Sequence, residues 1–265
     1  GAPSFFSKMS EKYRYVSKPP AMLLTHPLPE SRIADARQRA HNYPVKHLPP
    51  SLDFELAKAR IQARYQNSAQ DNIAYFKRQL KQQSYSLKAG AEYGLALSYF
   101  EHKQFQQAKT LLESLKAQDN NNLFYIDALT DVYLALKEYD VALSMLEPLT
   151  LLMPNNQVIS LNHGNALLES GRYQQAELVL QDFLLVNPEN YIANDLLTTV
   201  YRKQNKKGLM HITKAEVFVL LGAYNKAIDE LQTSYDFVED QPLLQKRIKA
   251  RILQVQEQEN KLKRL

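Results

Sequence analysis

Six histidines are the residues of this chain best suited to metal or acid–base chemistry: His26, His41, His47, His102, His163 and His211. An imidazole titrates near neutral pH and is a common metal ligand. His26 stands on the stiffest segment, because Pro27 and Pro29 hold the chain around it extended. A histidine so placed, just before a predicted helix over 30–40, could serve as a metal ligand or a gate. Taken alone, a histidine in a loop is far more often a surface residue.

The chain lacks the residue set that zinc chemistry requires. No two histidines have the His-Glu-x-x-His spacing that points two ligands to one side of a helix. There is no cysteine, which both the periplasm and the cytosol allow. We therefore expect this chain to show no peptidase activity, to bind no zinc tightly and to carry no cofactor of its own.

A period of 34 residues organises the elements that carry these side chains. Ala108, Ala142 and Ala176 are 34 apart, and each follows an aromatic residue by three places. Pro154 and Pro188 have the same spacing. Two antiparallel helices of about a dozen residues with two turns occupy about 34 residues. A small residue fits where such helices cross closely, and a proline cannot continue a helix.

These units resemble the tetratricopeptide repeat, which implies an all-α fold, an α-solenoid over 52–265. The clearest repeats are 89–122, 123–156, 157–190 and 208–241. Ala227 follows Ala176 by one and a half periods. We therefore interpret 191–207 as one extra helix, and 209–221 as serving the helices on both sides. A degenerate pair over 52–88 carries Ala59, Tyr65 and Ala74 in weak register.

The first 45 residues do not follow the period. The string LLTHPLPESRIADAR (23–37) resembles the His-Pro…Arg segment downstream of the zinc site in HtpX-like HExxH metalloproteases. Ser31 is expected to cap its helix. Together with the repeats, essentially the whole chain resembles the C-terminal part of the BepA-like periplasmic zinc metalloproteases. The resemblance implies a short metalloprotease remnant over 1–45, a proline-rich linker over 46–51 and the solenoid over 52–265.

The resemblance also implies a function. The chain would be the protein–protein interaction module of a periplasmic protease that assists outer-membrane protein assembly and degrades misassembled clients. The solenoid would bind those clients and the outer-membrane β-barrel assembly machinery. Zinc would belong to the full-length parent, where His26 would be a latent regulatory ligand, and Arg32 and Arg37 would pack or orient its protease domain. The alternative is a free-standing tetratricopeptide adaptor without enzymatic activity, but the segment 19–40 favours the protease.

Positions 2, 5, 6, 9, 12 and 13 of each repeat face the concave groove in the tetratricopeptide family. Mapped onto this chain, they give a mixed apolar and aromatic wall with three carboxylates and two asparagines. The lysines and arginines that grip a C-terminal carboxylate are missing, so an extended or β-rich client with apolar and some basic side chains fits better. Packing between helices is the alternative role for each residue. The predicted binding groove comprises Tyr93, Leu97, Phe100, Phe124, Asp127, Asp131, Leu134, Leu161, Asn162, Asn165, Leu168, Ile192, Asp195 and Leu196.

The charge pattern does not favour nucleic acid as a partner. The formal net charge is +5, but the 33 basic residues are scattered among 28 acidic ones. The densest basic patch lacks the interleaved aromatic residues that stack on bases, so we interpret it as the solvated face of a capping helix. It consists of Lys246, Arg247, Lys249 and Arg251. No stretch approaches 18 consecutive apolar residues, and no membrane span is expected.

Overall fold

The computed structural model describes Lys8 and the ranges 29–41 and 49–263, and in these ranges every regular element is an α-helix. The predicted all-α class is confirmed. The chain divides into two compact units, Gly1–Pro49 and Pro50–Leu265. The helices are Pro29–His41 (α2), Leu52–Tyr65 (α3), Ala69–Gln82 (α4), Lys88–Glu101 (α5), Phe105–Gln118 (α6), Leu123–Ala135 (α7), Tyr139–Leu152 (α8), Gln157–Glu169 (α9), Tyr173–Val186 (α10), Tyr191–Lys203 (α11), Lys207–Leu220 (α12), Tyr224–Tyr235 (α13) and Pro242–Lys263 (α14).

Helix α2 lies in the first unit. It begins at Pro29, and proline suits the first turn of a helix because its missing N–H has no intrahelical partner there. Ser31 therefore lies inside the helix, and the prediction that it caps the helix is wrong. On the exposed side, Arg39 pairs with Asp35 at 3.0 Å.

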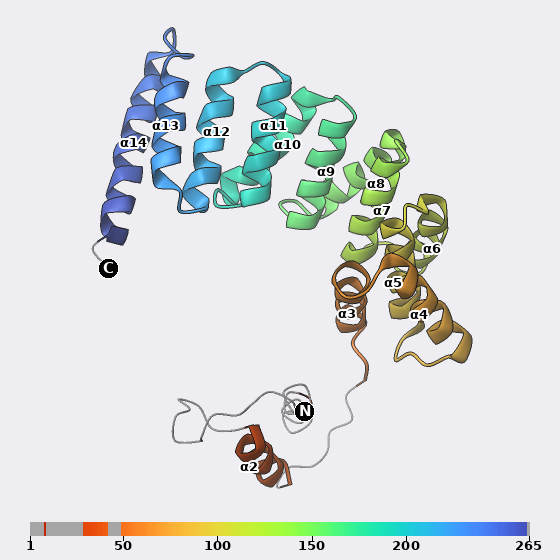
Figure 1. Ribbon diagram of the computed structural model, residues 1–265. Coiled ribbons are helices and arrows are strands. Elements are labelled where there is room, and N and C mark those ends of the chain that lie inside the picture. Colours follow the sequence, from red (N-terminus) through yellow and green to blue (C-terminus); the bar gives the residue numbers. More distant parts are fainter. Residues whose placement is uncertain (1–7, 9–28, 42–48, 264–265) are drawn as a thin grey trace. The chain divides into compact units, whose positions relative to one another are not determined.

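The second unit is a curved row of helix pairs (Figure 1). We call α3, α5, α7, α9 and α11 the inner helices, because each contacts the next one in the series. The outer helices α6, α8 and α10 each pack between the inner helix before and the inner helix after. Ala108, Ala142 and Ala176 lie on these outer helices and are fully buried, as expected for close crossings.

Two further features repeat every 34 residues and fix where the helices begin and end. Asn122, Asn156 and Asn190 cap α7, α9 and α11, each accepting hydrogen bonds from the first backbone N–H groups of its helix. The turns between inner and outer helices use a left-handed residue, at Lys103, Lys137, Gly171 and Asn205. Helices α7, α9 and α11 thus each start at an asparagine cap and stop at a left-handed turn.

The N-terminal pair α3–α4 is present, but two of its three predicted register marks point to solvent. Ala59 is buried, whereas Tyr65 is 78% exposed and Ala74 is exposed. The buried polar residue of α4 is Asn72, whose amide donates to the carbonyls of Gln62 and Ala63 at the end of α3. This amide ties the start of α4 to the end of α3.

The C-terminal part contains the helix that the spacing predicted to serve the helices on both sides. Helix α12 packs against both α11 and α13. The core divides at the same place, into one cluster from Leu56 to Tyr201 and a smaller one from Ala215 to Val255. No helix of the described residues is long and apolar enough to cross a membrane.

Candidate functional site

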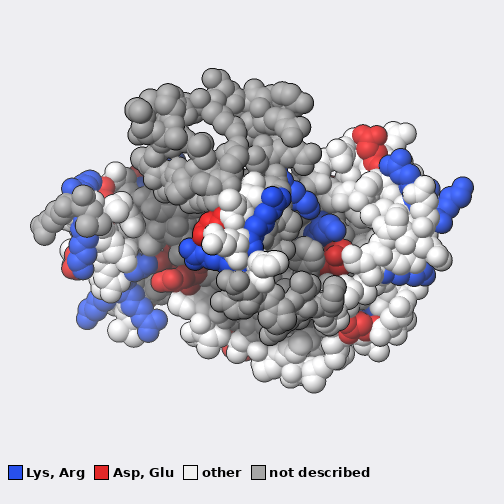
Figure 2. Space-filling view, turned by 90° about the horizontal axis from the view of Figure 1, so that it is seen from below, with Lys and Arg blue, Asp and Glu red and all other residues white. Residues whose placement is uncertain are grey.

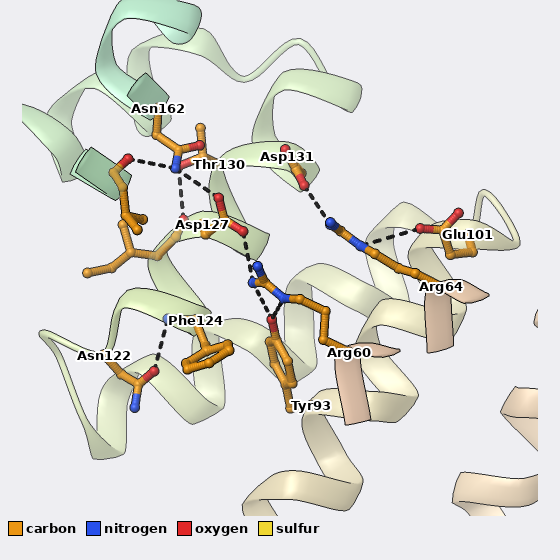
Figure 3. A network of polar contacts seen from close by, with 12 residues as sticks. Arg60, Arg64, Tyr93, Glu101, Asn122, Phe124, Asp127, Thr130, Asp131 and Asn162 are labelled. Atoms are coloured by element: carbon orange, nitrogen blue, oxygen red, sulfur yellow. Dashed lines mark hydrogen bonds and ion pairs between the residues drawn. The ribbon is translucent and has the colours of Figure 1, made fainter. Parts of the chain in front are cut away.

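A chain of polar contacts follows the inner helices and begins at Arg60 on α3 (Figure 3). The Arg60 guanidinium donates to the Tyr93 hydroxyl on α5 at 2.6 and 2.9 Å. It also pairs with Asp127 on α7 at 2.8 Å. The same guanidinium lies 5.1 Å from the ring centre of Phe124, close enough for a cation–π contact.

Asp127 extends this chain to a fourth inner helix. Its second carboxylate oxygen accepts a hydrogen bond from the Asn162 amide on α9 at 2.9 Å. The Asn162 amide also donates to the Val158 carbonyl of its own helix. Four consecutive inner helices are therefore joined by one polar network, Arg60–Tyr93–Asp127–Asn162, which we call the inner polar network.

A second arginine of α3 reaches the same helix α7. Arg64 pairs with Asp131 at 2.9 Å and lies 3.7 Å from a Glu101 oxygen on α5. Arg60 and Arg64 are one helical turn apart, as are Asp127 and Asp131, so the two pairs run side by side. Two of the three carboxylates of the predicted groove, Asp127 and Asp131, are thus paired with α3.

Burial changes the proton affinity of this surface. It raises the pKa of Tyr93 to about 12, although the nearby Arg60 charge acts in the opposite direction. It also raises the pKa of Asp131, with a contribution from the like charge of Asp127, while Arg64 lowers it. Burial disfavours the charge on Arg60, but Tyr93 and Asp127 more than offset this, so its pKa is raised. The Tyr93 phenol therefore stays neutral and the Arg60 guanidinium stays charged at physiological pH.

The predicted groove residues divide into three groups by exposure. Five are buried and serve as packing residues: Tyr93, Leu97, Leu161, Asn162 and Leu168. Seven are half-buried: Phe100, Phe124, Asp127, Asp131, Leu134, Asn165 and Leu196. Ile192, at 50%, and Asp195 are exposed. The two exposed residues of the predicted groove therefore lie on α11, beyond the four helices that the inner polar network joins.

Arg60 and Arg64 are the functional residues that the sequence analysis missed. They lie in the pair over 52–88, whose register was too weak for groove positions to be assigned. Their spacing of four residues on one helix face was the available signal. Their partners lie 67 residues away along the chain, as for Arg64 and Asp131, and no local pattern predicts such a pairing.

The histidines of the described residues do not form a metal site. His163 is buried and shares a 2.9 Å hydrogen bond with the Thr150 hydroxyl. His211 contacts Glu230 at 2.6 Å, His102 is exposed, and His41 ends α2. Within the ranges described, no three histidine, aspartate or glutamate side chains are grouped so as to hold a metal ion. These residues do not fit zinc. His26 lies outside them, as does the Arg32 side chain, and Arg37 is exposed on α2.

Comparison with known proteins supports the repeat fold. A family model described as tetratricopeptide repeat matches residues 133–194. A solved structure of a tetratricopeptide repeat protein from Parabacteroides merdae covers 96% of this chain and 99% of its own, at 13% identity and a TM-score of 0.49. The fold assignment rests on the helix pattern and on the family model.

Curated relatives cover nearly the whole chain. A protein of Escherichia coli described as a beta-barrel assembly-enhancing protease is 33% identical over 267 residues, which is 98% of this chain and 53% of its own length. The chain is homologous to beta-barrel assembly-enhancing proteases. Another such protease, from Yersinia pestis, is 31% identical over 96% of this chain and 52% of its own. A Vibrio cholerae protein, also described as a beta-barrel assembly-enhancing protease, is 39% identical over 96% of this chain and 52% of its own length. The chain thus spans about half the length of the beta-barrel assembly-enhancing proteases that it matches.

Proposed function

We propose that this chain is the protein-binding module of a periplasmic zinc metalloprotease that assists the assembly of outer-membrane β-barrel proteins and degrades misassembled ones. The observation that carries the proposal is the homology to beta-barrel assembly-enhancing proteases over 96% of the chain, which covers only about half of those proteins. The chain contributes a repeat solenoid, and the described residues hold no metal-ligand cluster. Peptide-bond cleavage therefore belongs to another part of the full-length protein.

The client surface that we propose is the accessible part of the inner face near α9 and α11. Asn165 and Leu196 are half-buried there, and Ile192 and Asp195 are exposed. This set offers an apolar contact, an amide and a carboxylate to an extended chain. An unfolded outer-membrane β-barrel protein, whose strands alternate apolar and polar side chains, fits this chemistry. The assembly machinery is the second class of protein partner that we propose.

Zinc and its regulation remain proposals for the full-length protein. His26 is proposed as a latent regulatory ligand in that protein. In this chain, no step of the reaction can be assigned to the described residues.

The proposal is tested by measuring two cleavage rates with the full-length protein. Ile192→Asp on the client surface should slow cleavage of an unfolded outer-membrane β-barrel protein, because it removes an apolar contact and adds negative charge. Cleavage of a short fluorogenic peptide, which has no need of the solenoid, should stay at the wild-type rate. Leu151→Asp is the matched control, since Leu151 is 86% exposed on the outer helix α8.

Two results would contradict the proposal. If the full-length protein cleaves neither substrate, the free-standing adaptor becomes the better interpretation. If Ile192→Asp and Leu151→Asp slow the cleavage of the β-barrel client equally, the inner face is not where the client binds.

A further inference from the structure

An apolar groove of about 530 Å³ lies on the outer helix α10. Its walls include Val179 and Leu184, and Leu197 of α11 contributes from the inner layer. Leu178 and Leu185 line it too, yet they are 66% and 79% exposed. These two leucines are seven residues apart and therefore share one face of the helix. An exposed apolar patch rimmed by polar side chains is a candidate interaction site.

The groove walls are held in place by contacts from the neighbouring helices. Gln181, which also lines the groove, donates a 2.7 Å hydrogen bond to the Tyr201 hydroxyl on α11. One turn earlier, Glu177 pairs with Lys206 at the start of α12 at 2.6 Å. Gln181 and Glu177 are thus held by contacts with α11 and Lys206, so a partner would meet a preformed surface.

The three repeats that contain α10 are acidic, although the chain as a whole is basic. Between residues 89 and 190 there are 13 Asp and Glu but only 5 Lys and Arg, although the whole chain has a net charge of +5. Asp182 lies between Leu178 and Leu185 on the same face of α10 and is exposed. Within the part of the chain that the structure describes, Asp182 forms no ion pair. The groove therefore presents leucine, carboxylate and leucine along one line.

We propose that this groove binds a basic amphipathic helix of a partner protein, with two apolar side chains seven residues apart and lysine or arginine between them. Such a helix would place its apolar residues beside Leu178 and Leu185 and its basic residue against Asp182. This is the helix-in-groove mode of recognition. The groove is lined on α10 from Leu178 to Leu185, which offers a partner about two turns of contact, roughly 12 Å. The inference goes beyond the client surface and does not depend on it, since α10 is an outer helix.

The test uses two synthetic helical peptides, each 14 residues long to match α10. One carries leucines seven apart with two lysines between them, and the other replaces those lysines with glutamates. Binding to the chain is followed by fluorescence anisotropy. We expect the lysine peptide to bind about tenfold tighter than the glutamate peptide, and less tightly as salt is raised.

Three variants distinguish binding in the groove from nonspecific binding elsewhere on the chain. Leu178→Asp should weaken binding of the lysine peptide by about tenfold or more. Asp182→Asn should leave the leucine contacts intact but remove most of the preference for lysine over glutamate. Leu253→Asp is the matched control, because Leu253 is also 66% exposed but lies on α14. Melting temperatures of all variants are measured alongside.

Three results would overturn the inference. The first is equal binding of the two peptides by the wild-type chain. The second is an equal effect of Leu178→Asp and Leu253→Asp in variants that melt like the wild type. The third is a concentration-dependent dimer, seen by light scattering and abolished by Leu178→Asp, because the groove would then bind a second copy of this chain.

Discussion

Asp127 shows how the inner face is held together at the scale of single residues. One of its oxygens pairs with Arg60 and the other accepts a hydrogen bond from Asn162. Both side chains of the Arg60–Asp127 pair are about three-quarters buried. A charge in such a place is stable only while its partner remains, because an unpaired buried charge keeps the full cost of its desolvation.

Arg60→Ala should therefore lower the free energy of unfolding by about 1–3 kcal/mol. The physical reason is that the half-buried Asp127 loses its charged partner while Tyr93 loses its donor. Urea denaturation of the variant measures this. Arg78→Ala, at an exposed position on α4, is the control and should stay within about 0.5 kcal/mol of wild type. Equal losses in the two variants would mean that the network contributes no stability.

The buried His163 predicts how stability depends on pH. Burial lowers the pKa of His163 below 6.5, and Glu147 opposes the shift only partly. Unfolded His163 takes up a proton near pH 6.5, whereas the folded chain resists it until the pH is lower. The stability that neutral His163 provides is thus present above about pH 6.5 and is lost as the pH falls toward the lowered pKa.

His163→Asn should make the melting temperature less sensitive to pH between 7.5 and 5.5. The Thr150 hydroxyl donates to the Leu146 carbonyl, so the Nδ1–H group of His163 donates to the Thr150 oxygen. The side-chain amide of an asparagine at this position can replace that donor. His102→Asn, at an exposed site, should keep the wild-type pH dependence. An unchanged pH dependence in His163→Asn would show that other groups cause it.

At the scale of helices and turns, the same left-handed turn costs a different conformational free energy at different positions of the chain. Gly171 adopts φ +79° freely, and a Cβ added there would have no neighbour within 4 Å. Lys137 occupies the equivalent position with φ 60°, which costs a residue with a Cβ about 1–2 kcal/mol.

Opposite effects are expected from exchanging these residue types. Lys137→Gly should stabilise the chain by about 1 kcal/mol, and Gly171→Ala should destabilise it by about the same amount. Thermal unfolding should show shifts of about 2–4 °C in opposite directions. Shifts of the same sign would refute the left-handed geometry at these turns.

Ala176 tests the helix crossing itself. It is fully buried on α10, so Ala176→Leu should overpack the crossing and cost roughly 1–3 kcal/mol, as should Ala142→Leu on α8. Ala135→Leu, at an exposed position at the end of α7, is the control and should change stability little. An unaltered melting temperature in Ala176→Leu would show that the crossing is not closely packed.

At the scale of the whole molecule, the solenoid was predictable from the sequence but the chemistry of its inner face was only partly so. The alanine spacing predicted the helix pairs because close crossings admit only small side chains. The asparagine caps and left-handed turns follow the same period. The left-handed turns at Lys103 and Lys137 could not be predicted from the sequence, because lysine has no preference for a left-handed conformation. Asp127 and Asp131 lie on the inner helix α7, and their pairing with arginines far away in the chain is set by tertiary packing, which no local pattern predicts.

The distribution of charge over the molecule argues for protein partners. Figure 2 shows lysine and arginine side chains near aspartate and glutamate side chains among the described residues of the face in view. A nucleic-acid surface would need a continuous basic band to neutralise successive phosphates. The local acidity of residues 89–190 instead favours partners that carry basic side chains.

The measurement that tests the central claim most directly is the affinity of this chain for an unfolded outer-membrane β-barrel protein, followed by fluorescence anisotropy. A dissociation constant on the order of micromolar is expected. The double variant Ile192→Asp with Asp195→Lys should weaken binding about tenfold, because it removes the apolar contact and reverses the charge for basic client groups. Leu151→Asp on the outer helix α8 should bind like the wild type. No binding by the wild-type chain, or equal weakening in both variants, would contradict the account.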